Sequence, residues 1–324
     1  MTPDRPDLTV VIVTHNGREL ALATLRSARA NSGDLAIEWI VADSGSSDGT
    51  PDAVEREWPD VRVIRCANLG FAHGNNAALV HARGRHVLLM NPDVEIRRGT
   101  LAELVAALDE RPGVGAASVI QRGTDGALLP SIRRFPSPGR DLGEALFAAR
   151  WPALRGAQEL DLDFGRYREE RSADWLSGAF LIARREAIED VGQLDERFFL
   201  YSEEIDWCYR LREAGWEIRH LPVMEIIHHC GPSEAPQLVA ELSHSRVLFA
   251  QKHYGRGRAS LIRMALTLKH LLRLILLAVP AAIKPSLRER LHAQILGLAV
   301  TAGGRRPPLS EAARALPTPA GGRS

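Results

Sequence analysis

One stretch of the chain, HVLLMNPD at His86–Asp93, decides the fold. Its first five residues form a largely apolar run, which is typical of a buried strand. The run ends in Asn91-Pro92-Asp93, so the strand carries a carboxylate at its C-terminal end, where open α/β sheets bind their ligands. A hard divalent cation bridges to phosphate oxygens through only one or two protein carboxylates, which makes Asp93 a candidate metal anchor of a nucleotide-diphosphate site. The same triplet is also an ordinary strand-to-turn sequence, so its neighbours must decide between the two interpretations.

Strands and helices alternate on both sides of this stretch. We expect strands at Leu8–Val13, Ile37–Ala42, Val61–Ile64 and His86–Met90, and helices at Glu19–Ala30, Asp52–Trp58, Asn75–Arg83 and Leu101–Arg111. Alternation at this spacing predicts an α/β fold with a mainly parallel central sheet covered on both faces. The short linkers predict one domain over residues 1–255, with residues 126–173 as a long excursion from the sheet.

Composition restricts the class of protein. The 324 residues are 45% hydrophobic and 25% charged, with a formal net charge of +1, which is typical of a globular chain and predicts no nucleic-acid partner. Three cysteines, Cys66, Cys208 and Cys230, lack any CxxC pairing. They fit a reducing cytosol and argue against a disulfide framework or a zinc knuckle. We therefore expect a cytoplasmic protein, and residues 1–8 show no signal peptide.

The C-terminal part has a different character. We expect an amphipathic helical extension over residues 256–302 and a disordered, Gly- and Pro-rich tail over residues 303–324. The apolar stretch Leu274–Ile283 is short and contains Pro280, so no segment is expected to be a clean transmembrane helix. Basic residues precede the stretch, which suits a helix lying on an anionic membrane surface. A helix packed on the main domain explains the same pattern, and the sequence leaves both interpretations open.

Asp43 and Ser44 follow the second expected strand. A carboxylate at this position can accept hydrogen bonds from a base or a ribose, whereas Asp48 and Gly49 can simply cap the next helix. The chain has neither G-x-G-x-x-G after its first strand nor G-x-x-x-x-G-K-[ST], so a dinucleotide dehydrogenase or a P-loop nucleotidase is poorly supported.

A cluster of three carboxylates, Glu203, Glu204 and Asp206, stands at the expected start of another helix. On a helix Glu203 and Asp206 share one face and Glu204 points elsewhere. One of them can act as a general base, although an acidic first turn also favours the helix dipole.

A late histidine, His228, follows a strand-like run and can supply a second metal ligand beside Asp93. Most lone histidines are not ligands. A zinc site made of His228, His229 and Cys230 is disfavoured, because adjacent side chains cannot easily turn toward one ion.

Taken together, these residues resemble the inverting family 2 glycosyltransferases with a GT-A fold. The motifs keep their order from Leu8 to Tyr254, and the Asn-Pro-Asp form most resembles bacterial rhamnosyltransferases that act on lipid-linked glycans. The resemblance implies a Rossmann-like nucleotide-diphospho-sugar transferase fold, with a nucleotide-binding half at about 8–125 and an acceptor half at about 126–255.

The resemblance also assigns roles to residues of this chain. The nucleotide-binding residues it implies are Thr14, His15, Asn16, Asp43, Ser44, Asn68, Gly70, Asn76, Asn91 and Asp93. Those of the acceptor pocket are Trp175, Ser177 and Gly178, although Trp175 also fits a core position. The implied metal ligands are Asp93 and His228. Glu204 stands where the family has its catalytic base, with Asp206 as the second choice and Glu203 as a further participant.

Two positions depart from the family pattern. Asn91 replaces the first aspartate of the D-x-D motif, which weakens one ribose or metal contact. Glu204 replaces an aspartate, and the extra methylene moves its carboxylate relative to the acceptor.

The activity that the resemblance implies is inverting transfer of a sugar, dTDP-rhamnose being the favoured donor, to a hydroxyl of a polyprenyl-diphosphate-linked saccharide. Magnesium or manganese would assist, and the enzyme would work in cell-wall or surface polysaccharide synthesis at the inner face of the cytoplasmic membrane. Two alternatives remain open, namely a family 2 transferase that uses a UDP-sugar and a non-catalytic nucleotide-binding protein on the same scaffold. The sequence predicts no oligomeric state.

Overall fold

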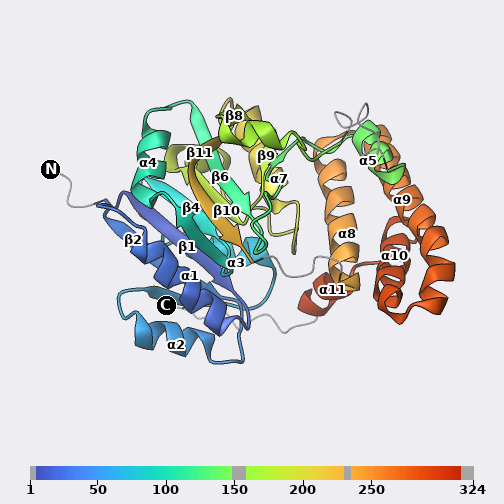
Figure 1. Ribbon diagram of the computed structural model, residues 1–324, viewed down its shortest axis with the longest axis horizontal. Helices are drawn as coiled ribbons and strands as arrows, with labels where there is room; N and C mark the ends of the chain where they lie inside the picture. Colours follow the sequence, from blue (N-terminus) through green and yellow to red (C-terminus); the bar gives the residue numbers. More distant parts are fainter. Residues whose placement is uncertain (1–4, 148–157, 230–234, 315–324) are drawn as a thin grey trace. The chain divides into compact units, whose positions relative to one another are not determined.

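The computed structural model describes residues 5–147, 158–229 and 235–314 (Figure 1). The chain divides into two compact units. The first, here called the sheet unit, comprises Met1–Phe135, Leu160–Asp195 and Glu204–Cys230. The second, the helical unit, comprises Pro136–Glu159, Glu196–Glu203 and Gly231–Ser324. The expected α/β fold is the sheet unit.

Within the described residues, the sheet unit holds a nine-stranded sheet in the order β3-β2-β1-β4-β10-β6-β11-β5, with β8 paired to β11. The strands are β1 Leu8–Thr14, β2 Ile37–Asp43, β3 Arg62–Arg65, β4 His86–Met90, β5 Val94–Arg98, β6 Val114–Arg122, β8 Arg171–Ser172, β10 Phe180–Arg184 and β11 Glu217–His228. β7 (Ile132–Arg133) and β9 (Trp175–Leu176) pair separately. β1 to β4, β6 and β11 run in one direction, and β10, β5 and β8 run in the other. The mainly parallel sheet is therefore confirmed.

Helices cover both faces of this sheet. They are α1 Arg18–Ala30, α2 Thr50–Glu57, α3 Phe71–Leu79, α4 Leu101–Asp109, α6 Arg185–Val191 and α7 Glu203–Glu213, with the 3-10 helix η3 at Phe164–Arg168. Apolar residues of α1, α2 and α4 form one core with alternate residues of β1. α3 packs on the opposite face, so closely that a Cβ on Gly74 would lie 2.6 Å from Cγ1 of Val13.

Two elements that border the carboxyl ends of the strands differ from the expectation. α3 begins at Phe71 and ends at Leu79, instead of spanning Asn75–Arg83, because Gly70 adopts φ 112°, a value that lets the chain turn into the helix earlier. β5 was not expected at all. Its sequence alternates between buried and exposed residues directly after the Asn-Pro-Asp turn, and it pairs antiparallel with β11 at the edge of the sheet.

The strand register brings several polar strand ends to one edge of the sheet. Thr14 pairs with Asp43 across β1 and β2, and Ile12 pairs with Met90 across β1 and β4. The backbone N–H of Ser44 donates to the carbonyl of Thr14 at 2.8 Å. We call this the carboxyl edge, and it carries the candidate site.

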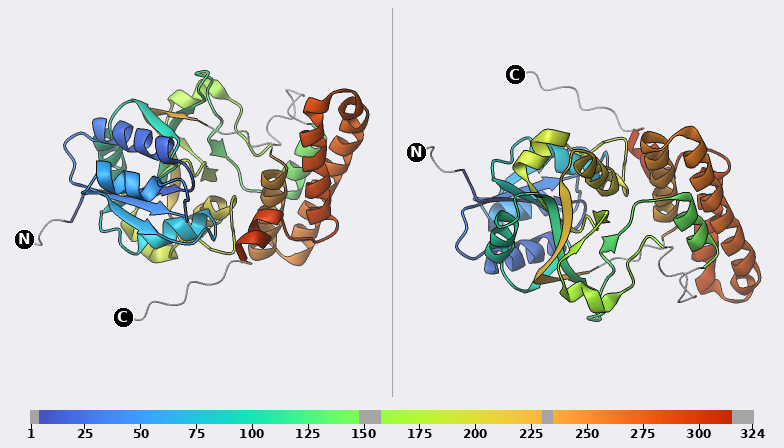
Figure 2. Two further views of the ribbon diagram at one scale, coloured as in Figure 1. Left: turned by 90° about the horizontal axis from the view of Figure 1, so that it is seen from below. Right: turned by 90° about the horizontal axis from the view of Figure 1, so that it is seen from above.

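The helical unit contains α5 Pro138–Ala145, α8 Pro236–His253, α9 Arg256–Ile283, the 3-10 helix η4 Pro285–Leu287, α10 Arg288–Thr301 and α11 Pro308–Arg314. α8, α9 and α10 pack against one another (Figure 2). α8 groups with these helices, so the main division falls before α8 and not at residue 255.

Two helices of the C-terminal part differ in extent from the expectation. α9 continues through Pro280 to Ile283 as one helix of 28 residues, and by length and composition alone it could cross a membrane. The proline stands in the last turn, where a lost backbone hydrogen bond shortens the helix little. Within the expected disordered tail, α11 forms and packs on α8, where the N–H of Ser310 donates to Glu241 at 3.3 Å. Residues 315–324 lie outside the described part of the chain.

Candidate active site

Asp43 stands at the carboxyl edge with its side chain almost fully buried. One carboxylate oxygen, Oδ2, accepts a hydrogen bond from the backbone N–H of Ser46 at 2.9 Å. The other, Oδ1, is buried and accepts no hydrogen bond within the described residues. The hydroxyl of Thr14, on the neighbouring strand, is buried in the same way. Buried acceptors without a donor are costly in a folded protein, so these two atoms are suited to a ligand that brings N–H or O–H groups.

The loop after β1 is tied to the loop after β2. The backbone N–H of Asn16 donates to Oγ of Ser46 at 2.8 Å, and the side-chain oxygen of Asn16 accepts from the N–H of Ser47 at 2.8 Å. Nδ1 of His15 lies 2.7 Å from the carbonyl oxygen of Ser44. Asn16 has φ 50°, a left-handed conformation that asparagine tolerates. The expected nucleotide-contacting loops are therefore held in place by their own polar groups.

The asparagine- and glycine-rich segment gives a mixed result. A Cβ on Gly45 would lie 3.9 Å from the backbone nitrogen of Asn68. The loop that contains Asn68 therefore borders the loop after β2. Asn76 does not point to a ligand. Its amide nitrogen donates to the carbonyl of Leu194 at 2.9 Å, and its amide oxygen accepts from the N–H of the same residue at 3.1 Å. We therefore correct the expected nucleotide contact of Asn76 to a structural bridge between α3 and the chain after α6.

The end of β4 meets the end of β11. Oδ1 of Asp93 lies 3.3 Å from Nε2 of His228, and Nδ2 of Asn91 lies 3.4 Å from the same nitrogen. The sequence predicted that Asp93 and His228 come together, and the structure brings them together. The residues that follow His229, from Cys230 to Glu234, lie outside the described part of the chain.

Thr24 fixes this turn, and sequence reasoning missed it. Its hydroxyl donates to the carbonyl of Pro92 at 2.7 Å and accepts from the N–H of Val94 at 3.2 Å, on either side of Asp93. The available signal was a threonine on the otherwise apolar face of α1, beside Leu25. A buried hydroxyl on such a face needs a hydrogen-bond partner, and here the partner is the metal-anchor turn.

Gly178 brings a third element to the carboxyl edge. It stands just before β10, whose partner is β4, and the N–H of Asn91 donates to the carbonyl of Ala179 at 2.9 Å. A Cβ on Gly178 would lie 3.4 Å from Cβ of Glu204 and 3.9 Å from its carboxyl carbon. Because Gly178 has no side chain, the Glu204 side chain has space beside the chain that leads from β4 to Asp93.

The three carboxylates of α7 differ in access. Glu204 is partly exposed, whereas Glu203 is 3% and Asp206 0% exposed. Oδ2 of Asp206 accepts from Nε of Arg210 at 2.9 Å, and Arg210 also donates to the carbonyl of Gln193 at 2.7 Å. A buried carboxylate committed to an arginine is a poor proton acceptor for a substrate. Asp206 therefore has a structural ion pair, whereas Glu204 is partly exposed with its Oε2 buried.

Trp175 occupies the core position that the sequence left open. Its side chain is 3% exposed, its indole N–H donates to the carbonyl of Arg134 at 2.9 Å, and the guanidinium of Arg133 stands 4.8 Å from its ring centre. The structure therefore favours the core position of Trp175 over its place in the acceptor pocket. Ser177 lies nearby, its N–H donating to the carbonyl of Ser131 at 3.2 Å.

The Asp93–His228 pair fits one divalent cation. Ligands in neighbouring positions of an octahedral ion with bonds of about 2.1 Å stand roughly 3 Å apart, close to the observed 3.3 Å. Oδ1 of Asp93 is buried and accepts no hydrogen bond within the described residues. In that part of the chain, no group of three His, Cys, Asp or Glu side chains could hold a metal.

Comparison with known proteins decides the family. Residues 9–192, more than half of the chain, match the model of Glycosyl transferase family 2. The chain belongs to glycosyl transferase family 2. Thr14 and Asp43, which end β1 and β2, and Asn91, which follows β4, all lie within the matched residues.

Relatives of this family 2 glycosyltransferase include an N-acetylglucosaminyl-diphospho-decaprenol L-rhamnosyltransferase from Mycobacterium tuberculosis (strain H37Rv). It is 34% identical over 281 residues, which cover 78% of this chain and 87% of the relative. The rhamnosyltransferase WbbL of Escherichia coli K12 is 23% identical and covers 68% of this chain and 82% of that protein. The mannosyltransferase PcManGT from Pyrobaculum calidifontis, solved in complex with GDP-Man and Mn2+, aligns with a TM-score of 0.59 at 20% identity, covering 94% of this chain and 89% of that one. The expected GT-A fold is confirmed.

Proposed function

We propose that this glycosyltransferase transfers rhamnose from dTDP-rhamnose to a hydroxyl of a polyprenyl-diphosphate-linked saccharide, with inversion at the anomeric carbon. The observation that carries the proposal is the convergence of Asp93, His228, Gly178 and Glu204 at the carboxyl edge. The 34% identity to a rhamnosyltransferase whose name specifies a diphospho-decaprenol-linked acceptor supports the choice of sugar and acceptor.

Glu204 is the proposed general base. It is the partly exposed carboxylate of α7, and Gly178 leaves space beside it. Its carboxylate takes the proton of the acceptor hydroxyl while that oxygen forms a bond to the anomeric carbon. The bond between the anomeric carbon and the diphosphate oxygen breaks, and its electron pair leaves with the nucleoside diphosphate. Attack from the face opposite the leaving group gives the inverted product.

The nucleoside end of the donor is assigned to the loops after β1 and β2. Oδ1 of Asp43 and the hydroxyl of Thr14 are the buried atoms that a base or ribose can satisfy. Asp93 and His228 would hold magnesium or manganese. Such an ion, when bound, neutralises charge on the departing diphosphate. Asn91, in place of an aspartate, lowers the negative charge beside this pair.

We also propose that the enzyme works at the inner surface of the cytoplasmic membrane, where a polyprenyl-linked acceptor would be found. The support is α9, which packs through residues such as Ile262 and Leu266 while Ile275, Val279 and Ile283 stay exposed. One side of α9 therefore packs inside the protein, and we propose that the other side contacts the membrane. Both interpretations that the sequence left open then apply to the same helix.

The test is metal-dependent release of nucleoside diphosphate from a panel of donors, with polyprenyl-diphosphate-GlcNAc as acceptor. We expect release from dTDP-rhamnose that needs both metal and acceptor. The variant Glu204→Gln is expected to lose at least about 100-fold in turnover and to keep its donor affinity, since general-base catalysis contributes 10²–10⁴-fold. The matched control is Glu213→Gln, an exposed carboxylate at the other end of α7.

Three outcomes would change the proposal. Selective release from a UDP-sugar would keep the mechanism and replace the donor. Full turnover by Glu204→Gln would refute the assigned base. Nucleotide binding without turnover of any donor by the wild-type protein would favour a binding protein on a GT-A scaffold.

A further inference from the structure

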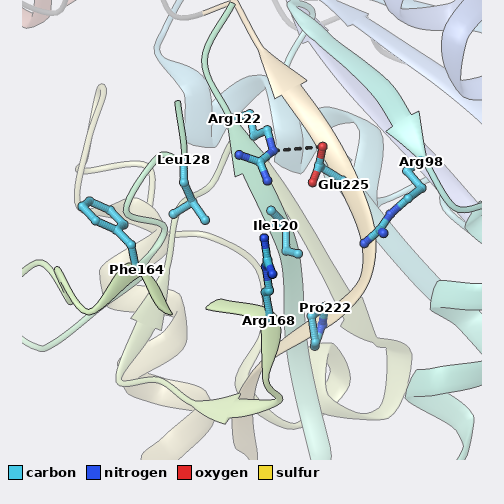
Figure 3. A pocket seen from close by; sticks show the side chains of 8 residues that line it. All are labelled: Arg98, Ile120, Arg122, Leu128, Phe164, Arg168, Pro222 and Glu225. Atoms are coloured by element: carbon cyan, nitrogen blue, oxygen red, sulfur yellow. Dashed lines mark ion pairs between the residues drawn. The ribbon is translucent and has the colours of Figure 1, made fainter. Parts of the chain in front are cut away.

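A hollow of about 520 Å³ lies in the sheet unit (Figure 3). Three arginines line it, Arg98 at the end of β5, Arg122 at the end of β6 and Arg168 at the end of η3. β5 runs away from Asp93, and five residues at about 3.3 Å each place Arg98 roughly 16 Å along the strand from Asp93. Arg122 lies nearer to the proposed donor site, because its backbone pairs with Ile227, the residue before His228.

The side chains of the three arginines turn toward the same space, with Ile120 among them (Figure 3). Apolar groups complete the wall. Ile120 is buried, Phe164 is 46% exposed, and Leu128 and Pro222 stand at the sides. The volume falls in the range of small-molecule sites, and polar groups make up more of the lining than apolar groups.

The charges in the hollow do not balance. Glu225 is the acidic residue of the lining, and its Oε1 lies 2.9 Å from Nε of Arg122 and 3.5 Å from Nε of Arg97, which stands outside the lining. Among the described residues, neither Arg98 nor Arg168 has an ion pair or a side-chain hydrogen bond. Two exposed guanidinium groups thus face one space, and an anion bound there would supply a counter-charge to both.

The remaining arginine is held in position. Arg122 contacts Glu225 through Nε and donates through a terminal nitrogen to the carbonyl of Gly126 at 3.0 Å. A guanidinium fixed by its neighbours loses little rotamer entropy on binding a ligand. Arginine forks match the oxygens of phosphate groups, to which they donate two parallel hydrogen bonds.

We propose that this hollow is a second anion site, which binds a phosphate or diphosphate group through Arg98, Arg122 and Arg168. Phe164 and Ile120 contact the apolar part of the molecule that carries this group. A lipid-linked diphosphate and a free phosphate compound share this chemistry, and the second arm of the experiment separates them.

The first arm measures binding of inorganic pyrophosphate to the full-length protein by isothermal titration calorimetry in EDTA. Without metal, the proposed donor site contributes little. We expect Arg168→Gln and Arg98→Gln each to weaken pyrophosphate binding about tenfold, the loss typical of one charge-assisted contact. Arg166→Gln is the matched control. It removes the same charge from the same 3-10 helix, but its partner is Glu169 and it does not line the hollow.

Two further variants test where pyrophosphate binds and whether a positively charged lining binds it. Asp93→Asn is expected to keep pyrophosphate binding, because it changes only the carboxyl edge. Glu225→Gln is expected to tighten it, because the one negative charge in the lining is removed. Melting temperatures of all variants verify that the sheet unit remains folded.

Three results would overturn the proposal. They are equal weakening by Arg168→Gln and Arg166→Gln, loss of binding in Asp93→Asn, and no pyrophosphate binding by the wild-type protein at millimolar concentration.

The second arm measures Michaelis constants and rests on the proposed function. A raised acceptor KM with an unchanged donor KM in Arg168→Gln identifies the lipid-linked diphosphate as the ligand. Unchanged constants, together with weakened pyrophosphate binding, identify a free phosphate compound.

Discussion

Oδ1 of Asp93 lies 3.3 Å from Nε2 of His228, and the strand register fixes this distance. β5 leaves directly from Asp93 and pairs antiparallel with β11, so that Val94 stands opposite His228. The N–H of His229 donates to the carbonyl of Asp93 at 2.9 Å and closes the junction. The two side chains are therefore brought together by backbone hydrogen bonds, before any ion binds.

This relationship predicts that both residues set metal affinity. We expect His228→Gln to raise the Mn2+ concentration needed for half-maximal turnover by about 10- to 100-fold, and Asp93→Asn to do so at least as strongly, because ligand changes at metal sites have effects of this size. The measurement is nucleoside diphosphate release against Mn2+ concentration. His229→Gln serves as the control, since its ring points to Glu95 at 3.5 Å. An equal effect of His229→Gln would contradict the assignment.

Gly178 yields a prediction about the space around the proposed base. Alanine should be accepted, because its Cβ would meet Cβ of Glu204 at 3.4 Å, an ordinary contact. Valine adds branches that must displace the Glu204 side chain, and a misplacement of about 1 Å can cost 10²-fold in rate. We expect Gly178→Val to lower kcat by about that factor.

The comparison for Gly178→Val is Gly139→Val, because nothing lies within 4 Å of a Cβ at Gly139. Thermal melts distinguish loss of folding in Gly178→Val from displacement of Glu204 in a folded variant. A fall in kcat with an unchanged melting temperature indicates displacement of Glu204. Normal kcat in the folded variant would show that Glu204 does not need this space.

Much of the site was predictable, because strand ends in a parallel sheet meet at one edge. Asp43, Asp93 and His228 each follow an apolar run, and the register aligns those ends. Glu204 was assigned from the resemblance to the family, and the structure adds that Glu203 and Asp206 share the buried face of the helix.

What the sequence did not reveal depends on tertiary partners. The amide of Asn76 and the indole of Trp175 find backbone carbonyls far away in the chain, so their roles cannot be read from local pattern. The antiparallel β10 is short and apolar, and only its pairing with β4 places Gly178 beside Asn91. Thr24 could have been suspected, but its partner Pro92 could not.

His270 predicts how the helical unit responds to acid. It is buried, with Nε2 2.9 Å from Oγ of Ser243 and Nδ1 2.9 Å from Oε1 of Gln294. Burial lowers its pKa from 6.5 to about 4. Between these values the unfolded chain binds a proton that the folded unit does not, so stability falls as pH falls from 6.5 to 4, by up to about 3 kcal/mol.

The measurement for His270 is the free energy of unfolding against pH. His270→Gln should be less stable near neutrality and lose less stability between pH 6.5 and 4. His292→Gln, at an exposed position of α10, should keep the wild-type slope. If His270→Gln also keeps that slope, another group is responsible for it.

The exposed side of α9 predicts membrane binding that depends on its apolar side chains. Ile275, Val279 and Ile283 are 62%, 70% and 75% exposed, and the exposed Lys284 and Arg288 follow, which suits anionic headgroups. Burying one such aliphatic side chain contributes about 1.5–3 kcal/mol, so Ile275→Glu with Val279→Glu should weaken binding to anionic liposomes at least about tenfold.

The control for α9 is Leu242→Glu, an exposed apolar residue of α8. α9 is long and apolar enough to span a membrane, yet Ile262 and Leu266 pack inside the helical unit together with α8. A helix that keeps this packing can only lie on the surface, so alkaline carbonate should release the bound protein. Resistance to carbonate would instead show that α9 leaves its partners and crosses the bilayer. Equal liposome binding by the α9 variant and the wild-type protein would show that this side of the helix faces water.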